Sequence, residues 1–178
     1  MNVLALDLSL TRTGWATTNA VGTLVPPKGW TGVVRLLWLR EQMRQMVRQP
    51  QPIPVPDLVI IEGYSYGVAR GNALTQLGEL GGIIRVLLHE LGIPWVEVPP
   101  AVLKKYAANR GNATKAEVLV AAVKRLGYDG SDHNEADALW LRTMALDWYG
   151  CNESPVPKVQ REGLAKIRWP EVGRKEAA

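Results

Sequence analysis

Residues 58–61 (LVII) constrain the fold of this chain more than any other segment, because they are all apolar and run directly into the carboxylate of Glu62. A strand with one face in water alternates apolar and polar residues. A strand that is apolar throughout is typical of a parallel sheet covered on both faces. The run therefore predicts a central strand in a sheet that has helices on both sides.

The other segments fit around such a strand. Short strand-forming runs, separated by turns, predict an antiparallel meander at 3–8, 15–18 and 21–25. Another strand is expected at 95–98, and helical patterns occur at 33–49, 72–91, 101–108, 114–127 and 132–149. This order predicts an α/β fold with a mixed five-stranded sheet, antiparallel first and then parallel, and helices on both faces.

Two helix starts carry cap signals. Thr114 with Glu117 predicts a capping box, and Asp132 with Glu135 predicts a second one. The proline-rich residues 50–56 predict an extended connector. We place one domain at 1–150 and a basic, partly ordered tail at 151–178, because residues 155–178 hold six basic side chains against three acidic ones.

Composition narrows the class of protein. The 178 residues suffice for one domain with a real core, and the net charge of +4 is compatible with a polyanionic partner. Cys151 is the single cysteine, which excludes a disulfide within the chain and a cysteine zinc site. No apolar run is long enough for a membrane span, and the start is typical of a strand rather than of a secretion signal. We therefore expect a cytoplasmic location.

Three acidic residues occupy positions where a charge is costly. Asp7 interrupts the first strand, Glu62 ends the most apolar one, and Asp137 has apolar neighbours on most sides of its helix. Taken singly, each acid has an ordinary interpretation. Asp7 can be a turn former, Glu62 a strand-end charge that meets solvent, and Asp137 part of a solvent-exposed face of its helix. Together they would repel one another when buried, and divalent cations offset such repulsion. Two Mg²⁺ ions held by carboxylates can drive phosphodiester cleavage, which is the chemistry that we predict.

The order of these acids resembles the acidic core of the RuvC-type Holliday-junction resolvases, which have an RNase H-like fold. The resemblance covers about residues 1 to 150 and includes residues 71–73, 77–82, 99–106 and 111–115. The segment 132–139 (DHNEADAL) is similar to the compact phage forms of the family.

The resemblance implies a crossover junction endonuclease that makes symmetric nicks in four-way DNA and leaves a 5′-phosphate and a 3′-hydroxyl. It implies that Asp7 bridges two Mg²⁺ ions, for which Mn²⁺ can substitute, and that Glu62 and Asp137 each hold one. It also implies a homodimer, since two identical sites suit a substrate with approximate two-fold symmetry.

One position departs from the family pattern. The family has an Asp or a His three residues before the last Asp, and this chain has Asn134, whose amide oxygen is a poorer metal ligand. At ~100° per residue, Asn134 lies about 60° and His133 about 40° from Asp137 around the helix. The resemblance makes Asn134 our first candidate for a fourth ligand, because it occupies the position of the family's Asp or His. Asp132, which is also an N-cap candidate, and His133, which is as readily a surface residue, are the alternatives.

Basic and aromatic residues suggest how DNA would bind. The candidate phosphate contacts are Lys104, Lys105, Arg110 and Lys115. The loop after Glu62 offers Tyr64 and Tyr66, which either stack on unpaired bases or pack as half-buried aromatics, and Arg70.

Three glycines fall inside the helical pattern at 72–91, namely Gly78, Gly81 and Gly82. Such glycines cost helix stability and indicate close approach of another backbone. That backbone belongs either to a second copy of the chain or to the sheet.

Other functions remain open at this stage. The same carboxylates would serve another RNase H-like nuclease that cuts flaps or RNA–DNA hybrids. Asn134 leaves room for a non-catalytic module that binds branched DNA. An actin-like ATPase or a sugar kinase is improbable, because those folds need duplicated domains and about twice this length.

Overall fold

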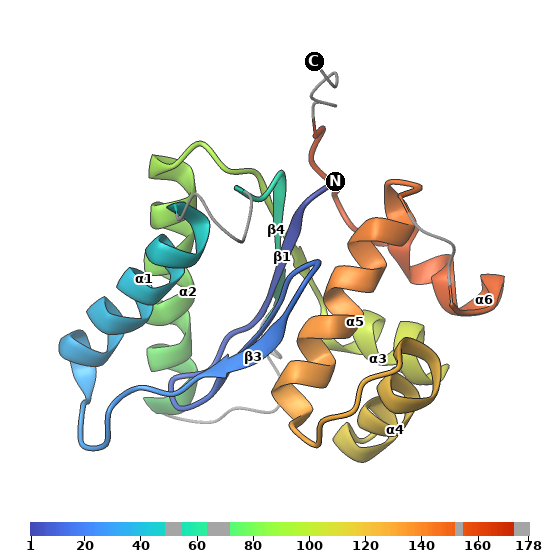
Figure 1. Cartoon of the computed structure of the whole chain (residues 1–178), viewed down its shortest axis with the longest axis horizontal. Helices are drawn as coiled ribbons and strands as arrows, with labels where there is room; N and C mark the ends of the chain where they lie inside the picture. Colours follow the sequence, from blue (N-terminus) through green and yellow to red (C-terminus); the bar gives the residue numbers. More distant parts are fainter. Residues whose placement is uncertain (49–54, 64–71, 152–154, 173–178) are drawn as a thin grey trace.

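Figure 1 shows the chain as a computed structural model, which describes residues 1–48, 55–63, 72–151 and 155–172. Three of the predicted DNA contacts, Tyr64, Tyr66 and Arg70, lie outside the described residues, as does most of the proline-rich connector. Among the described residues, no helix is long and apolar enough to cross a membrane.

A mixed five-stranded sheet forms the centre of the fold. Its strands are β1 (Val3–Asp7), β2 (Thr13–Ala16), β3 (Val21–Leu24), β4 (Leu58–Glu62) and β5 (Trp95–Val98). They lie in the order β3-β2-β1-β4-β5, with β1, β2 and β3 antiparallel and with β4 parallel to both β1 and β5. The predicted sheet, antiparallel first and then parallel, is confirmed.

Strands β1 and β4 are buried on both faces, as the apolar run predicted. Val3 pairs with Leu58 and Leu6 with Ile61, so the two strands run side by side in register. Their side chains alternate between two cores: Val3, Ala5, Leu58 and Ile60 belong to one, and Leu4, Leu6, Val59 and Ile61 belong to the other. The sheet therefore separates two helical layers.

Helices α1 to α5 make up those layers (Figure 1). Helices α1 (Gly32–Arg48) and α2 (Asn72–Glu90) cover one face, and α3 (Pro100–Ala108), α4 (Lys115–Leu126) and α5 (His133–Trp148) cover the other. The prediction of helices on both faces is confirmed.

Helix α5 lies directly on the sheet and is buried along most of its length. Trp140 is fully buried, and its indole nitrogen donates a hydrogen bond to the carbonyl of Val118 at 3.2 Å. The ring of Tyr106 meets it edge-on, with the ring centres 5.9 Å apart. These contacts bind α5 to α4 and α3, so the three helices form one rigid layer over β1 and β2.

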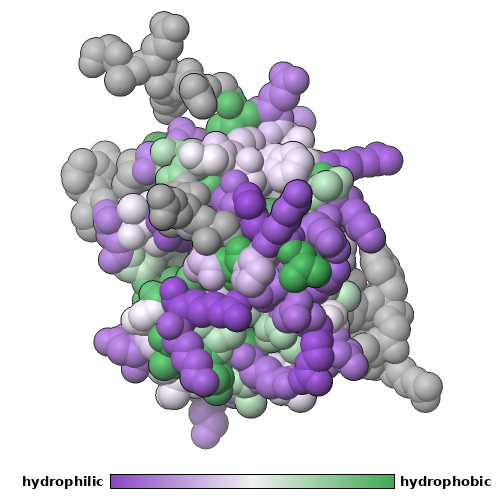
Figure 2. All heavy atoms as spheres, turned by 90° about the vertical axis from the view of Figure 1, so that its right-hand side faces the viewer, coloured by the Kyte–Doolittle hydropathy of each residue, from purple (hydrophilic) through white to green (hydrophobic). Residues whose placement is uncertain are grey.

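Residues beyond 150 also pack onto this layer. Helix α6 (Lys158–Arg161) and the 3₁₀ turn η1 (Glu162–Lys166) lie against α3. The Gln160 side chain donates to the carbonyl of Tyr106 at 2.7 Å, and Trp169 stacks on Trp148 at 5.4 Å. Figure 2 shows this side of the molecule, where hydrophilic side chains dominate and hydrophobic ones are scattered. The described part of the tail, 155–172, is therefore folded onto the domain, while the boundary at residue 150 remains a prediction.

Candidate metal centre

Three carboxylates converge at one end of the sheet. Asp7 and Glu62 are the last residues of β1 and β4, which are adjacent and parallel, so both side chains leave the sheet at the same edge. Asp137 reaches them from the second turn of α5. One oxygen of each residue lies within 4.8 Å of one oxygen of each of the others. Asp7 and Asp137 are each 7% exposed, and Glu62 is half-buried.

Burial and repulsion by neighbouring acids disfavour the charged forms of Asp7 and Asp137. Burial raises the pKa of Asp7 well above its ordinary value, and the charge of Glu62, a hydrogen bond with Glu62 and the charge of Asp137 raise it further. Burial, and then the charge of Glu62, raise the pKa of Asp137 to about 7. The cluster therefore lacks positive charge close to its oxygens.

Two lysines supply part of that charge from a greater distance. Lys115 lowers the pKa of both Asp7 and Asp137, and Lys104 lowers that of Asp137. The other two predicted phosphate contacts have carboxylate partners: Lys105 forms an ion pair with Glu162 at 3.1 Å, and Arg110 forms one with Glu117. Lys104 and Lys115 thus act electrostatically on the acids, whereas Lys105 and Arg110 are held in ion pairs with other residues.

Asn134 lies against Gly14 in a tight contact between α5 and β2. Gly14 pairs with Asp7 in the sheet. A Cβ atom on Gly14 would lie 2.1 Å from the carbonyl oxygen of Asn134 and 2.9 Å from its Cβ atom. Only glycine allows this approach, so the first turn of α5 sits directly over the residue that neighbours Asp7.

The two alternatives to Asn134 lie differently. Asp132 is the N-cap of α5, and one of its carboxylate oxygens accepts the backbone N–H groups of Asn134 and Glu135 at 2.8 and 3.4 Å. Its other oxygen forms an ion pair with Arg12. The Nδ1 atom of His133 is buried without a hydrogen-bond partner in the described structure.

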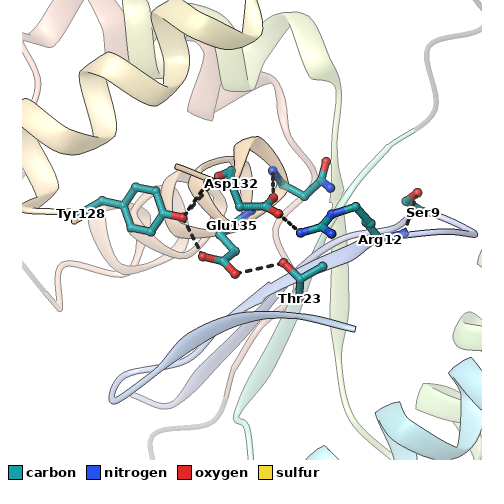
Figure 3. A network of polar contacts seen from close by, with 7 residues as sticks. Ser9, Arg12, Thr23, Tyr128, Asp132 and Glu135 are labelled. Carbon is teal, nitrogen blue, oxygen red and sulfur yellow. Dashed lines mark hydrogen bonds and ion pairs between the residues drawn. The ribbon is translucent and has the colours of Figure 1, made fainter. Parts of the chain in front are cut away.

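A polar network fixes the start of α5 (Figure 3). The Tyr128 hydroxyl donates to Glu135 at 2.6 Å, and the Thr23 hydroxyl donates to the other oxygen of Glu135 at 3.0 Å. The predicted capping box at Thr114 is confirmed, but the one at Asp132 is wrong in its second half. The Glu135 side chain does not accept the backbone N–H of Asp132, because its carboxylate accepts hydrogen bonds from the hydroxyls of Tyr128 and Thr23 instead.

The donor set suits a divalent cation. Three carboxylates with crowded oxygens, of which Asp7 and Asp137 have raised pKa values, are stabilised by a bound metal, and hard oxygen ligands are those that Mg²⁺ and related ions prefer. Sequence reasoning missed Arg12, Thr23 and Tyr128, whose partners lie elsewhere in the chain. Only Arg12 gave a signal, as a basic residue five positions after Asp7.

Known proteins with similar sequences share one name. No family model matches the chain. The crossover junction endodeoxyribonuclease RuvC of Prochlorococcus marinus is 28% identical over 158 residues, which cover 84% of this chain and 99% of that protein. The RuvC of Chloroflexus aggregans is 27% identical over 176 residues, which cover 93% and 100%.

Solved structures agree on the fold. RuvC of Thermus thermophilus superposes with a TM-score of 0.64 at 19% identity and covers 84% of this chain and 97% of its own. The same protein in complex with a Holliday junction substrate gives a TM-score of 0.66 at 19% identity, over 79% of this chain and 90% of its own. We conclude that the chain is similar over most of its length to the crossover junction endodeoxyribonucleases named RuvC and that it shares the fold of the solved RuvC structures.

Proposed function

We propose that this protein is a structure-selective endonuclease that resolves four-way DNA junctions by metal-dependent phosphodiester hydrolysis with symmetric nicks. The observation that carries the proposal is the convergence of Asp7, Glu62 and Asp137 at one edge of the sheet. The curated relatives are named for the same reaction, and one solved structural neighbour holds a Holliday junction.

We propose Mg²⁺ as the cofactor, two ions with Mn²⁺ as a substitute, held by Asp7, Glu62 and Asp137. When bound, such ions lower the pKa of a water molecule and stabilise the charge on the leaving oxygen. The contribution of the chain is to keep three ionisable oxygens together in a site that β1, β4 and α5 hold rigid. Asn134 is our candidate for a fourth, neutral ligand, since Gly14 brings it over the neighbour of Asp7.

Positive side chains beside the acids would bind the substrate. Lys104 and Lys115 are close enough to shift the pKa of Asp137, so a phosphate at the metal centre would lie within their field. Lys115 also opens α4, and a helix N-terminus favours an anion. Arg110 and Lys105 would join only after leaving Glu117 and Glu162. Base stacking by Tyr64 and Tyr66 and a phosphate contact from Arg70 remain predictions.

We propose a homodimer, in which two sites act on the two cleaved strands. Helix α2 is the candidate interface: apart from the neighbouring backbone of α2 itself, no atom of the described chain lies within 4 Å of a Cβ atom placed on Gly78 or Gly82. Gly78 and Gly82 therefore leave room for a second copy of the chain, whereas Gly81 is buried, so packing of the helix on the sheet remains the alternative. Light scattering of the purified protein tests the dimer, and a monomer at cleavage-competent concentrations would contradict it. A cytoplasmic location and a phage-like origin also remain predictions.

The test of the function is a cleavage assay. An end-labelled four-way junction and a linear duplex of matched sequence are incubated with the protein in Mg²⁺, in Mn²⁺ and in EDTA. Paired, symmetric, metal-dependent nicks in the junction, with the duplex intact, are expected. Cleavage of both substrates would leave a nuclease of wider specificity, and binding without cleavage would favour the non-catalytic module.

The Asp7→Asn variant locates the reaction. It should bind the junction and cut neither strand, because it removes one carboxylate charge and hardly changes shape. A variant that still cuts would show that the metal centre lies elsewhere.

A further inference from the structure

Arg12 lies in the turn between β1 and β2, at the edge of the sheet where the three acids converge. Asp7 ends β1 only five positions before it, and Ser9 orders the turn. The Ser9 hydroxyl oxygen accepts the backbone N–H of Arg12 at 3.4 Å, and the Thr13 hydroxyl donates to the Ser9 carbonyl at 2.6 Å. The base of the Arg12 side chain is therefore fixed close to the metal centre.

The guanidinium of Arg12 remains accessible to a ligand. Its side chain is 54% exposed, and within the described part of the chain its single side-chain partner is Asp132 (Figure 3). The cations that shift the pKa of the buried acids are Lys104 and Lys115, from α3 and α4. Arg12 thus forms no ion pair with the three acids of the described site.

The ion pair with Asp132 is not needed to hold α5. Tyr128 and Thr23 already fix Glu135, and Gly14 packs against Asn134. Asp132 caps the helix with the oxygen that Arg12 does not use, so it would keep its backbone contacts if Arg12 moved away. An exposed ion pair of this kind is worth little, at most about 1 kcal/mol. A phosphate competes well for such an arginine, because two parallel hydrogen bonds are available to it.

We propose that Arg12 binds a backbone phosphate of the DNA close to the scissile one on the same strand, about two phosphates away, and that Asp132 holds the guanidinium in place until DNA arrives. Asp132 is five residues from Asp137, which is about 7.5 Å along a helix axis. Successive phosphates of one strand are spaced about 3.4 Å along a duplex axis, so the contact falls about two phosphates from the reacting one. This inference rests on the proposed function.

The test measures binding of a fluorescent four-way junction by anisotropy at several KCl concentrations, with every variant in the Asp7→Asn background. Arg12→Ala should weaken binding about tenfold and reduce the salt slope by about one. The affinity of Arg12→Lys should fall between those of Arg12→Ala and the background protein. Lysine keeps the positive charge but lacks the two parallel N–H donors of the guanidinium. Asp132→Asn keeps a capping oxygen, removes the competing charge, and should tighten binding on the order of threefold.

The double variant Arg12→Ala/Asp132→Asn separates a specific contact from a general effect of charge. Asp132→Asn should have no effect on binding in the Arg12→Ala background. Arg40 and Glu90 form a matched control, an exposed ion pair between the two helices across the sheet. Arg40→Ala and Glu90→Gln make the same charge changes and should alter binding less than about twofold.

Two results would overturn the inference: Arg12→Ala that binds like Arg40→Ala, or an Asp132→Asn effect that persists without Arg12. If Arg12→Ala is unfolded by circular dichroism, Arg12→Lys and Asp132→Asn decide by the same criteria. Wild-type cleavage of the junction is measured in parallel. If the wild type cuts and Arg12 has no effect, only this inference falls; if it neither binds nor cuts, the proposed function falls as well.

Discussion

Two buried aspartates on the same helix have opposite surroundings. Asp137 and Asp147 lie ten residues apart on α5 and are 7% and 5% exposed. Asp147 accepts two hydrogen bonds from the guanidinium of Arg161, at 2.6 and 2.8 Å, and a third from the Tyr106 hydroxyl at 2.9 Å. Asp137 has no hydrogen bond or ion pair among the described residues and faces two other acids.

The difference supports the proposal that Asp137, and not Asp147, belongs to a metal centre. The carboxylate of Asp147 has three hydrogen-bond donors, and these contacts fix the C-terminal segment onto α3 and α5. A buried carboxylate left among like charges is destabilised in the free protein, and such an arrangement persists where a ligand relieves it. Burial alone would have given both residues the same interpretation.

The largest expected effect is the loss of cleavage in Asp137→Asn. The amide keeps the shape and removes a charged ligand, so we expect the single-turnover rate on a four-way junction to fall on the order of a thousandfold or more. The matched control is Asp147→Asn, the same change at the other end of α5, whose folded fraction should cut at the wild-type rate. Comparable losses in both variants would remove the distinction between the two aspartates.

The next effect concerns stability at the other aspartate. Arg161→Ala leaves Asp147 buried with Tyr106 as its remaining side-chain donor. We expect the free energy of unfolding, measured in urea, to fall by roughly 2–3 kcal/mol. This is a reduced figure, because the Arg161 side chain is 42% exposed and partly screened. Lys158→Ala, an exposed change on the same short helix, should shift stability by less than about 0.5 kcal/mol. Equal effects would mean that the ion pair does not anchor the segment.

A smaller effect links Asp137 to pH. Its pKa is raised to about 7 from an ordinary value of 3.8, so the folded protein binds a proton that the unfolded chain releases. This stabilisation is fully present below pH 3.8 and is lost as pH rises through about 7. In EDTA, the free energy of unfolding of Asp137→Asn should therefore exceed that of the wild type by on the order of 1–2 kcal/mol at pH 8, and by little at pH 5. Thermal melts at the two pH values check this, and a gain that is the same at both would contradict it.

The elements and the three acids were predictable because local patterns encode them. The apolar run ending at Glu62 predicted a doubly covered strand, and parallel pairing with β1 then brings Glu62 and Asp7 to one edge. Thr114 and Glu117 are three residues apart, so their capping box could be read from the sequence. In each case the interacting residues are near neighbours in the sequence, or the periodicity of apolar residues defines the face of the strand or helix on which they lie.

The partners of the polar side chains were not predictable. Arg12 and Asp132 are separated by 120 positions, and Thr23 and Glu135 by 112. Periodicity indicates which face a residue occupies but not which residue it meets there. The same limit explains why the predicted capping box at Glu135 was wrong. The carboxylate of Glu135 binds the hydroxyls of Tyr128 and Thr23, which come near it only in the folded chain. Asp147 and Arg161, only 14 positions apart, fall on either side of the assumed domain boundary.

The smallest effect separates two adjacent lysines of α3, which extend the comparison between the two aspartates. Lys104 acts on Asp137, whereas Lys105 pairs with Glu162, next to the arginine that binds Asp147. Lys104→Ala should lower kcat/KM on the junction about fivefold and reduce the salt dependence of binding, and Lys105→Ala should change both by about twofold or less. Both variants lose one positive charge, so general attraction to DNA falls equally. Equal losses in the two would mean that the net charge of this face, rather than contact beside Asp137, draws the substrate to the metal centre.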